Sequence, residues 1–187
     1  MLKSGLSNKQ IEELVLKAQN ADIDAFGKLY DHFIDAIYRY VYFKVGKDEA
    51  LDLTENIFLK VWENLKSYKK GDKHFSAWLF RIAHNTVVDH YRLSKESLSL
   101  DLDLPDNKRQ NDPVVLTEQR MGSENLHRAI GKLKKKYQQI IILKYINELE
   151  NQEIARIMRR SEGSLRILKF RALKALKQIL EDMNVNY

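Results

Sequence analysis

The chain has 187 residues, of which 44% are hydrophobic, so it can fill the core of one medium or two small domains. It contains no cysteine, which excludes disulfides and thiolate metal sites. No apolar leader opens the sequence and no run of about 18 apolar residues occurs in it, so we expect a cytoplasmic protein that is neither secreted nor membrane-spanning.

Helical periodicity runs through most of the chain, and no alternating strand pattern competes with it. Ser7 with Gln10 three residues later has the pattern of a capping box, which predicts a helix that ends near Asn20. Asp22 is a suitable cap for a second helix, which ends near Gly46 and carries apolar and aromatic residues at core spacing. We therefore predict an all-α fold.

A third predicted helix, residues 47–67, has two faces of different character. Its inward face is apolar and includes Ile57 and Val61. On the other face, acidic and amide side chains surround an apolar residue that the pattern leaves exposed, Leu59; they are Asp52, Glu55, Asn56 and Glu63. One exposed leucine alone means nothing. Acids around it, however, repel nucleic acid and favour its burial against a protein partner.

A polar connection, residues 68–74, leads into a fourth helix predicted for residues 75–92. The connection holds three lysines, an aromatic residue and Gly71, which permits a tight bend. The outer face of the helix is predicted to mix cations, polar groups and aromatic rings: Phe80, Arg81, His84, Asn85, Tyr91 and Arg92. Such a face suits single-stranded nucleic acid, since bases stack on rings and the backbone meets positive charge. An ordinary solvated face is an equally good interpretation of this helix taken alone.

The helical period fails between residues 94 and 122, where both prolines occur and Asp, Asn, Ser and Gln accumulate. Asp101 and Asp103 do not make a calcium loop, because the third ligand position falls on Pro105 and no glycine follows. We predict two small helical domains, residues 1–94 and 123–187, joined by a flexible linker, residues 95–122.

A new helical pattern begins at Ser123 and provides two helices before a helix-turn-helix at residues 151–176. Ser161 is a suitable N-cap for the second helix of that motif. Residues 156–177 hold eight basic residues and one acid, which is the electrostatic footprint of a phosphate-binding surface. A solvated basic face is the alternative, but it does not account for two apolar side chains on the same face, Ile167 and Phe170. In the major groove such side chains can contact thymine methyl groups. The outward residues are Arg166, Ile167, Phe170, Arg171 and Lys174.

Three runs of sequence resemble the extracytoplasmic-function (ECF) class of bacterial sigma factors, the small promoter-recognition subunits of RNA polymerase. Residues 50–62, ALDLTENIFLKVW, resemble the segment that docks on the clamp helices of the polymerase. Residues 75–85, FSAWLFRIAHN, resemble the segment that opens and reads the minus-10 element, and residues 153–172 resemble the minus-35 reader. One such run is a weak signal, whereas three in this order with a linker between them are specific.

The resemblance implies three groups of functional residues. The first binds core polymerase: Asp52, Glu55, Asn56, Leu59 and Glu63. The second binds the minus-10 DNA, with residues 68–74 as the loop that captures an extruded base: Tyr68, Lys69, Lys70, Lys73, Phe75, Arg81, His84, Asn85 and Arg92. The third binds the minus-35 duplex: Arg160, Ser164, Arg166, Ile167, Phe170, Arg171 and Lys174.

The resemblance implies an alternative sigma factor that binds core RNA polymerase, directs it to specific promoters and assists melting of the DNA. Its partners would be core polymerase, double-stranded minus-35 DNA, melted minus-10 DNA and, as a further partner, an anti-sigma factor. We expect no covalent chemistry, no catalytic residue, no metal and no cofactor, since magnesium and nucleotidyl transfer belong to the polymerase. The histidine residues accordingly show no H-E-x-x-H spacing.

A different class of function is also open: a stand-alone helix-turn-helix regulator whose N-terminal domain binds a signal or dimerises. That protein would bind palindromic duplex sites without polymerase. Four positions depart from the ECF pattern. Glu55 and Asn56 replace a glutamine followed by a glutamate, and Ile167 replaces a small polar residue. Arg159 stands where glycine is common, and a left-handed backbone there costs about 1–2 kcal/mol.

Overall fold

The computed structural model describes residues 6–69, 74–98 and 118–183, and within them it is helical without a β-strand. The all-α prediction is therefore confirmed. Two of the predicted loop lysines, Lys70 and Lys73, and residues 99–117 of the predicted linker lie outside the described residues. In chain order the elements are α1 (Asn8–Gln19), α2 (Ile23–Val45), α3 (Lys47–Asn64), a 3-10 turn (Leu65–Ser67), α4 (Phe75–Leu98), α5 (Glu118–Lys132), α6 (Lys135–Ile141), a π-helical turn (Ile142–Ile146), α7 (Asn151–Met158) and α8 (Glu162–Asp182).

The first helices begin where the sequence placed their caps. The Ser7 hydroxyl accepts from the backbone N–H of Gln10, and the Gln10 side chain accepts from the Ser7 N–H at 2.8 Å, which completes the capping box. Asp22 accepts from the N–H of Ala25 at 2.9 Å. Gly46, with φ 93, separates α2 from α3 in a conformation that favours glycine. Local chemistry thus fixes these boundaries.

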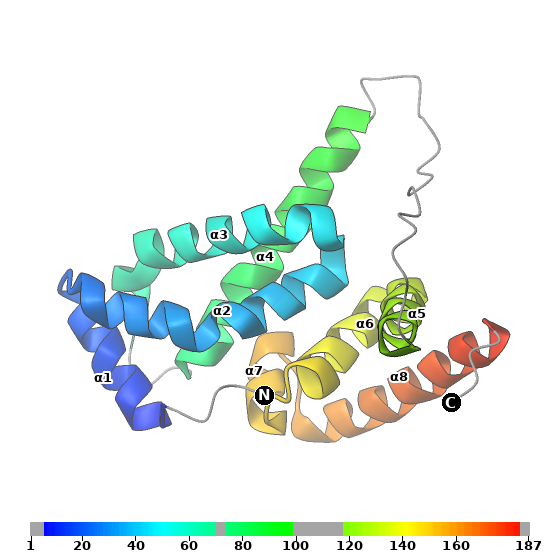
Figure 1. The fold of residues 1–187 in the computed structure, drawn as a ribbon. Coiled ribbons are helices and arrows are strands. Elements are labelled where there is room, and N and C mark those ends of the chain that lie inside the picture. Colours follow the sequence, from blue (N-terminus) through cyan, green and yellow to red (C-terminus); the bar gives the residue numbers. More distant parts are fainter. Residues whose placement is uncertain (1–5, 70–73, 99–117, 184–187) are drawn as a thin grey trace.

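Helices α1 to α4 form an N-terminal unit in which α2 packs against the other three (Figure 1). Aromatic rings fasten α4 to α2, since Phe33 meets Phe75 and Tyr40 meets Phe80 with ring centroids 5.6 Å apart in both pairs. The inward face predicted for α3 is buried as expected: Ala50, Thr54, Ile57, Phe58, Val61 and Leu65.

The prediction that Phe80 lies on an outer face is wrong, because this side chain is fully buried. Its ring stands edge-on to the buried ring of Tyr40. Helix α4 contacts α1, α2, α3 and α7. A helix enclosed by neighbours in this way buries more than the single stripe that its periodicity indicates.

Helices α5 to α8 form a C-terminal unit, in which α8 packs against α5, α6 and α7 (Figure 1). The two helices predicted before the helix-turn-helix are present as α5 and α6. The π-helical turn that follows α6 was not predicted. It is closed by Asn147, which is 1% exposed and whose backbone N–H donates to the carbonyl of Ile142 at 2.9 Å. This turn redirects the chain into α7.

The two units pack against each other, which nothing in the sequence had indicated. Helix α7 contacts α4, while α5 and the π-helical turn contact α2 (Figure 1). Buried apolar residues of both units belong to one continuous cluster. The functional surfaces must therefore be considered together with this contact.

Candidate protein and nucleic-acid interfaces

The predicted protein-docking surface lies along one stripe of α3, which we call the α3 patch. Leu59, at its centre, is 63% exposed. Trp62, one turn further along, was missed; it is 38% exposed and its ring packs edge-on to Phe26 at 4.8 Å. Trp62 therefore enlarges the apolar centre of the patch. Because its indole already packs on Phe26, it loses little conformational freedom when a partner binds. The surrounding polar side chains are all exposed: Asp52, Glu55, Asn56 and Glu63.

Tyr68 and Phe75 were predicted to contact DNA, but the structure buries both, at 6% and 2% exposure. The Tyr68 hydroxyl donates to Glu12 Oε1 at 2.6 Å, and burial together with this carboxylate raises the pKa of Tyr68. Both rings also pack on Trp78, with centroids 5.4 and 5.6 Å away. The structure therefore packs these two rings into the core at the ends of the 68–75 connection, and their contact with DNA stays a prediction. Lys69 is exposed.

A groove of about 320 Å³, which we call the α3–α4 groove, opens between the end of α3 and the middle of α4. Its lining residues are Lys60, Asn64, Ser67, Trp78, Arg81, Ile82, Asn85, Thr86 and Asp89. Arg81 and Asn85 were predicted as nucleic-acid contacts, whereas Lys60, Asn64 and Trp78 were missed because α3 and α4 meet only in the folded chain. An indole wall, two primary amides and two cations together offer stacking, base-edge hydrogen bonds and phosphate contacts.

His84 and Arg92 occupy different environments on α4. His84 is half-buried, with Nδ1 3.1 Å from the Tyr40 hydroxyl, and burial followed by the nearby Lys44 charge lowers its pKa. A neutral His84 ring that is hydrogen-bonded to Tyr40 holds the tyrosine hydroxyl in place and is poorly suited to bind a phosphate. Arg92 is exposed, seven residues beyond Asn85 and therefore on the same side of the helix.

Helix α8 presents the face that the sequence predicted. Ile167 is 56% and Phe170 is 70% exposed, and the cations beside them, Arg166, Arg171 and Lys174, are exposed as well. Ser161 caps the helix by accepting from the N–H of Ser164 at 3.3 Å. Arg160 is exposed, and its guanidinium is 3.5 Å from the half-buried Ser164 hydroxyl. The opposite stripe is buried against the unit through Leu165, Leu168 and Ala172.

The turn between α7 and α8 is left-handed at Arg159, with φ 53 and ψ 50, as predicted. Its backbone N–H is directed to the last carbonyls of α7, those of Ala155 and Arg156. The following N–H, of Arg160, donates to the Ala155 carbonyl at 2.9 Å. This pattern ends α7 and turns the chain into α8.

Two family comparisons follow this division into units. The sigma-70 region 2 family matches residues 29–96, and the sigma-70 region 4 family matches residues 123–176. The chain is 31% identical to the ECF RNA polymerase sigma factor SigW of Bacillus subtilis, across 92% of this chain and 98% of SigW. The chain belongs to the ECF sigma factors. It is accordingly an alternative sigma factor.

Another relative of this sigma factor is the ECF sigma factor BldN of Streptomyces coelicolor, 35% identical across 91% of this chain and 66% of BldN. Among solved structures, CnrH in complex with the cytosolic domain of CnrY matches with a TM-score of 0.71, at 22% identity over 94% of this chain and 99% of CnrH. RpoE of Bartonella quintana, in complex with the anti-sigma factor NepR, matches with a TM-score of 0.65, at 19% identity over 83% of this chain and 96% of RpoE. These two structural matches establish a shared fold.

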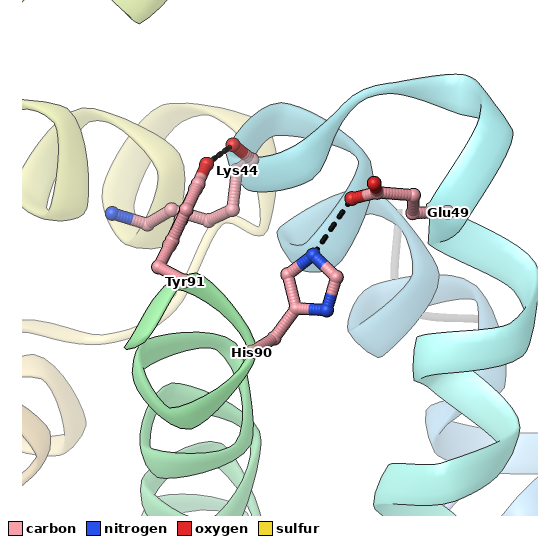
Figure 2. A network of polar contacts seen from close by, with 4 residues as sticks. All are labelled: Lys44, Glu49, His90 and Tyr91. Carbon is pink, nitrogen blue, oxygen red and sulfur yellow. Dashed lines mark hydrogen bonds and ion pairs between the residues drawn. The ribbon is translucent and has the colours of Figure 1, made fainter. Parts of the chain in front are cut away.

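In this sigma factor a polar network connects His90 and Tyr91, in the second half of α4, with the α2–α3 turn (Figure 2). The Tyr91 hydroxyl donates to the carbonyl of Lys44, and His90 Nε2 lies 2.8 Å from a carboxylate oxygen of Glu49. The Lys44 ammonium donates to Gln138 of α6 at 2.9 Å. Burial, with Lys135 nearby, lowers the pKa of Lys44 to about 8. The network ties α2, α3 and α4 to α6 of the C-terminal unit.

Within residues 6–69, 74–98 and 118–183, no group of three or more His, Asp or Glu side chains is arranged to hold a metal ion. Over the same described part of the chain, the helices are too short or too polar to cross a membrane.

Proposed function

We propose that this sigma factor binds core RNA polymerase through the α3 patch. Leu59 and Trp62 give the patch an apolar centre, and the exposed acids around it select a basic partner surface and reject DNA. Burying an exposed leucine on docking contributes about 2 kcal/mol, so Leu59 is expected to dominate the interface.

The α3–α4 groove is proposed to hold an unstacked base of the melted minus-10 strand. Stacking on Trp78 contributes about 1–3 kcal/mol, which offsets the few kcal/mol needed to remove a base from the duplex. The amides of Asn64 and Asn85 would read the base edge. Arg81 and Lys60 would bind the phosphates, and the buried Arg81 Nε, which has no hydrogen-bond partner among the described residues, is available for such a contact.

The exposed face of α8 is proposed to read the minus-35 duplex. Arg166 is suited to guanine in the major groove, while Ile167 and Phe170 are suited to thymine methyl groups. The remaining contacts would be to phosphates, from Arg160, Ser164, Arg171 and Lys174. If about five phosphates are neutralised, log affinity should fall with log salt at a slope of about −4 to −5.

The chain is proposed to work in the cytoplasm without catalysis, metal or cofactor, as residues 1–94 and 123–187 connected through residues 95–122. An anti-sigma factor is a proposed additional partner, because CnrH and RpoE, which share the fold, were solved with CnrY and with the anti-sigma factor NepR.

The observation that carries this proposal is the exposed Leu59 at the centre of an acidic stripe on α3. Leu59→Asp should raise the Kd for core polymerase at least about thirtyfold, measured by anisotropy of the labelled protein. Leu16→Asp on α1, at a leucine that is 41% exposed, is the control and should change little. Normal core binding by Leu59→Asp would refute the α3 patch. Failure of the wild type to bind core, with specific duplex binding by itself, would favour a stand-alone regulator.

A further inference from the structure

Among the described residues that line the α3–α4 groove, Asp89 is the one acid. The other groups that the groove offers to nucleic acid are an indole, amides and the cations Lys60 and Arg81. Asp89 is exposed, and its carboxylate forms no hydrogen bond or ion pair with any of the described residues. A carboxylate repels phosphates, so a strand in the groove has to meet Asp89 with hydrogen-bond donors.

Asp89 belongs to a row of three polar side chains along α4. Arg81, Asn85 and Asp89 follow one another at intervals of four residues and therefore lie on the same side of the helix. The row presents a cation, an amide and a carboxylate, in that order. A strand that lies along it meets a partner for its phosphates first and hydrogen-bonding groups for its bases after that.

The groove is too long for Asp89 to share a base with Trp78. Both residues line it, and they stand eleven positions apart on α4, which corresponds to about 16 Å along the helix axis. Stacked bases of one strand rise only about 3.4 Å each. A base stacked on Trp78 therefore ends well short of Asp89, and the Asp89 end of the groove is open to a different base of the same strand.

The four bases suit a carboxylate to different degrees. A carboxylate has two acceptor oxygens and no donor. On the Watson–Crick edge, which an unpaired base exposes, guanine alone carries two adjacent donors, N1–H and the N2 amino group. Cytosine and adenine place an acceptor nitrogen beside their amino group, and thymine flanks its N3–H with two carbonyl oxygens. Guanine can therefore bind both carboxylate oxygens, whereas each other base sets an acceptor against the charge.

From these observations we propose that Asp89 forms a second base subsite of the α3–α4 groove, which selects a guanine of the melted strand through its Watson–Crick edge. Asn85 lies between this subsite and the one at Trp78. The inference rests on the proposed function, since it requires the melted strand to occupy the groove.

The expected selectivity follows from the geometry and the exposure of the carboxylate. A bidentate contact to a base edge discriminates against the wrong base by about 5- to 150-fold. Asp89 is exposed, so water weakens its hydrogen bonds and its repulsion of acceptors alike. A preference near the lower end of that range, about tenfold, is therefore expected.

The test measures binding of labelled single strands to the holoenzyme by anisotropy. The strand is a short oligothymidine that carries one guanine, which is moved through its positions one at a time. With guanine at one position, the wild type should bind about tenfold more tightly than it binds thymine alone. At that position inosine, which lacks the N2 amino group, should lose most of the gain. 7-Deazaguanine, which keeps the Watson–Crick edge of guanine, should retain it.

Asp89→Asn keeps the size of the side chain and removes its charge. It should reduce the preference for guanine to about twofold or less. It should also raise the affinity for the all-thymine strand, because a negative charge near the phosphates and the thymine carbonyls is gone. Asp31→Asn, at an exposed position on α2, is the matched control and should change neither affinity.

Equal binding of the guanine and thymine strands by the wild type would overturn the guanine subsite, and so would an unchanged preference in Asp89→Asn. A variant that weakens both strands alike would show a merely structural Asp89. Inosine that binds as tightly as guanine, or loss of the gain with 7-deazaguanine, would also overturn contact through the two adjacent donors. Each of these results leaves the groove as a strand-binding site. If the holoenzyme forms but binds none of the strands, the proposed function of the groove is wrong, and the subsite with it.

Discussion

Replacing Arg159 by glycine is expected to stabilise the protein, although it removes a whole side chain. The backbone at Arg159 is left-handed, with φ 53 and ψ 50, where a Cβ atom costs about 1–2 kcal/mol. Glycine avoids that strain but gains about 0.4–1 kcal/mol of freedom in the unfolded chain. The Arg159 side chain is exposed, so little packing is lost. The net gain should be about 0.5–1 kcal/mol.

Urea unfolding should show this gain as a higher midpoint at unchanged slope, and thermal unfolding as a rise of about 1–4 °C. Ala21→Gly is the positive control, because Ala21 has φ 65 and is also exposed. Lys177→Gly is the negative control, since it lies within α8 and should lose about 1 kcal/mol. A loss of stability in Arg159→Gly, with the expected gain in Ala21→Gly, would refute the strain argument at the helix-turn-helix.

Three more outcomes are expected. Burial, with Lys135 nearby, lowers the pKa of Lys44 to about 8, from the ordinary lysine pKa of 10.5 that applies in the unfolded chain. The unfolded chain therefore binds more protons between these two values, and the free energy of unfolding measured in urea should rise by about 1.5 kcal/mol from pH 8 to pH 9.5. Lys44→Met should flatten this rise. Phe170→Ala should leave stability unchanged, because the ring is 70% exposed, yet weaken minus-35 duplex binding about fivefold in anisotropy titrations. Asn85→Ala, also at an exposed position, should weaken holoenzyme binding to a single-stranded minus-10 oligonucleotide about tenfold without lowering the melting temperature.

The features that sequence reasoning predicted correctly are those decided within one or two helical turns. Ser7, Asp22 and Ser161 cap helices through hydrogen bonds that span three residues. The stripe of α3 around Leu59 and the outer face of α8 follow from a period of 3.6 residues on helices that each have one open side. Such features depend little on where the rest of the chain lies.

The errors concern residues whose environment is set by distant segments. Phe80 has the spacing of an outer residue, but Tyr40, forty positions earlier, covers it. Tyr68 has the composition of a loop contact, but its hydroxyl is bound by Glu12 from α1. The sequence did not predict Trp78 as a nucleic-acid contact. Trp78 lines the groove only because α4 packs beside the end of α3 in the folded chain. Local periodicity carries no information about such contacts.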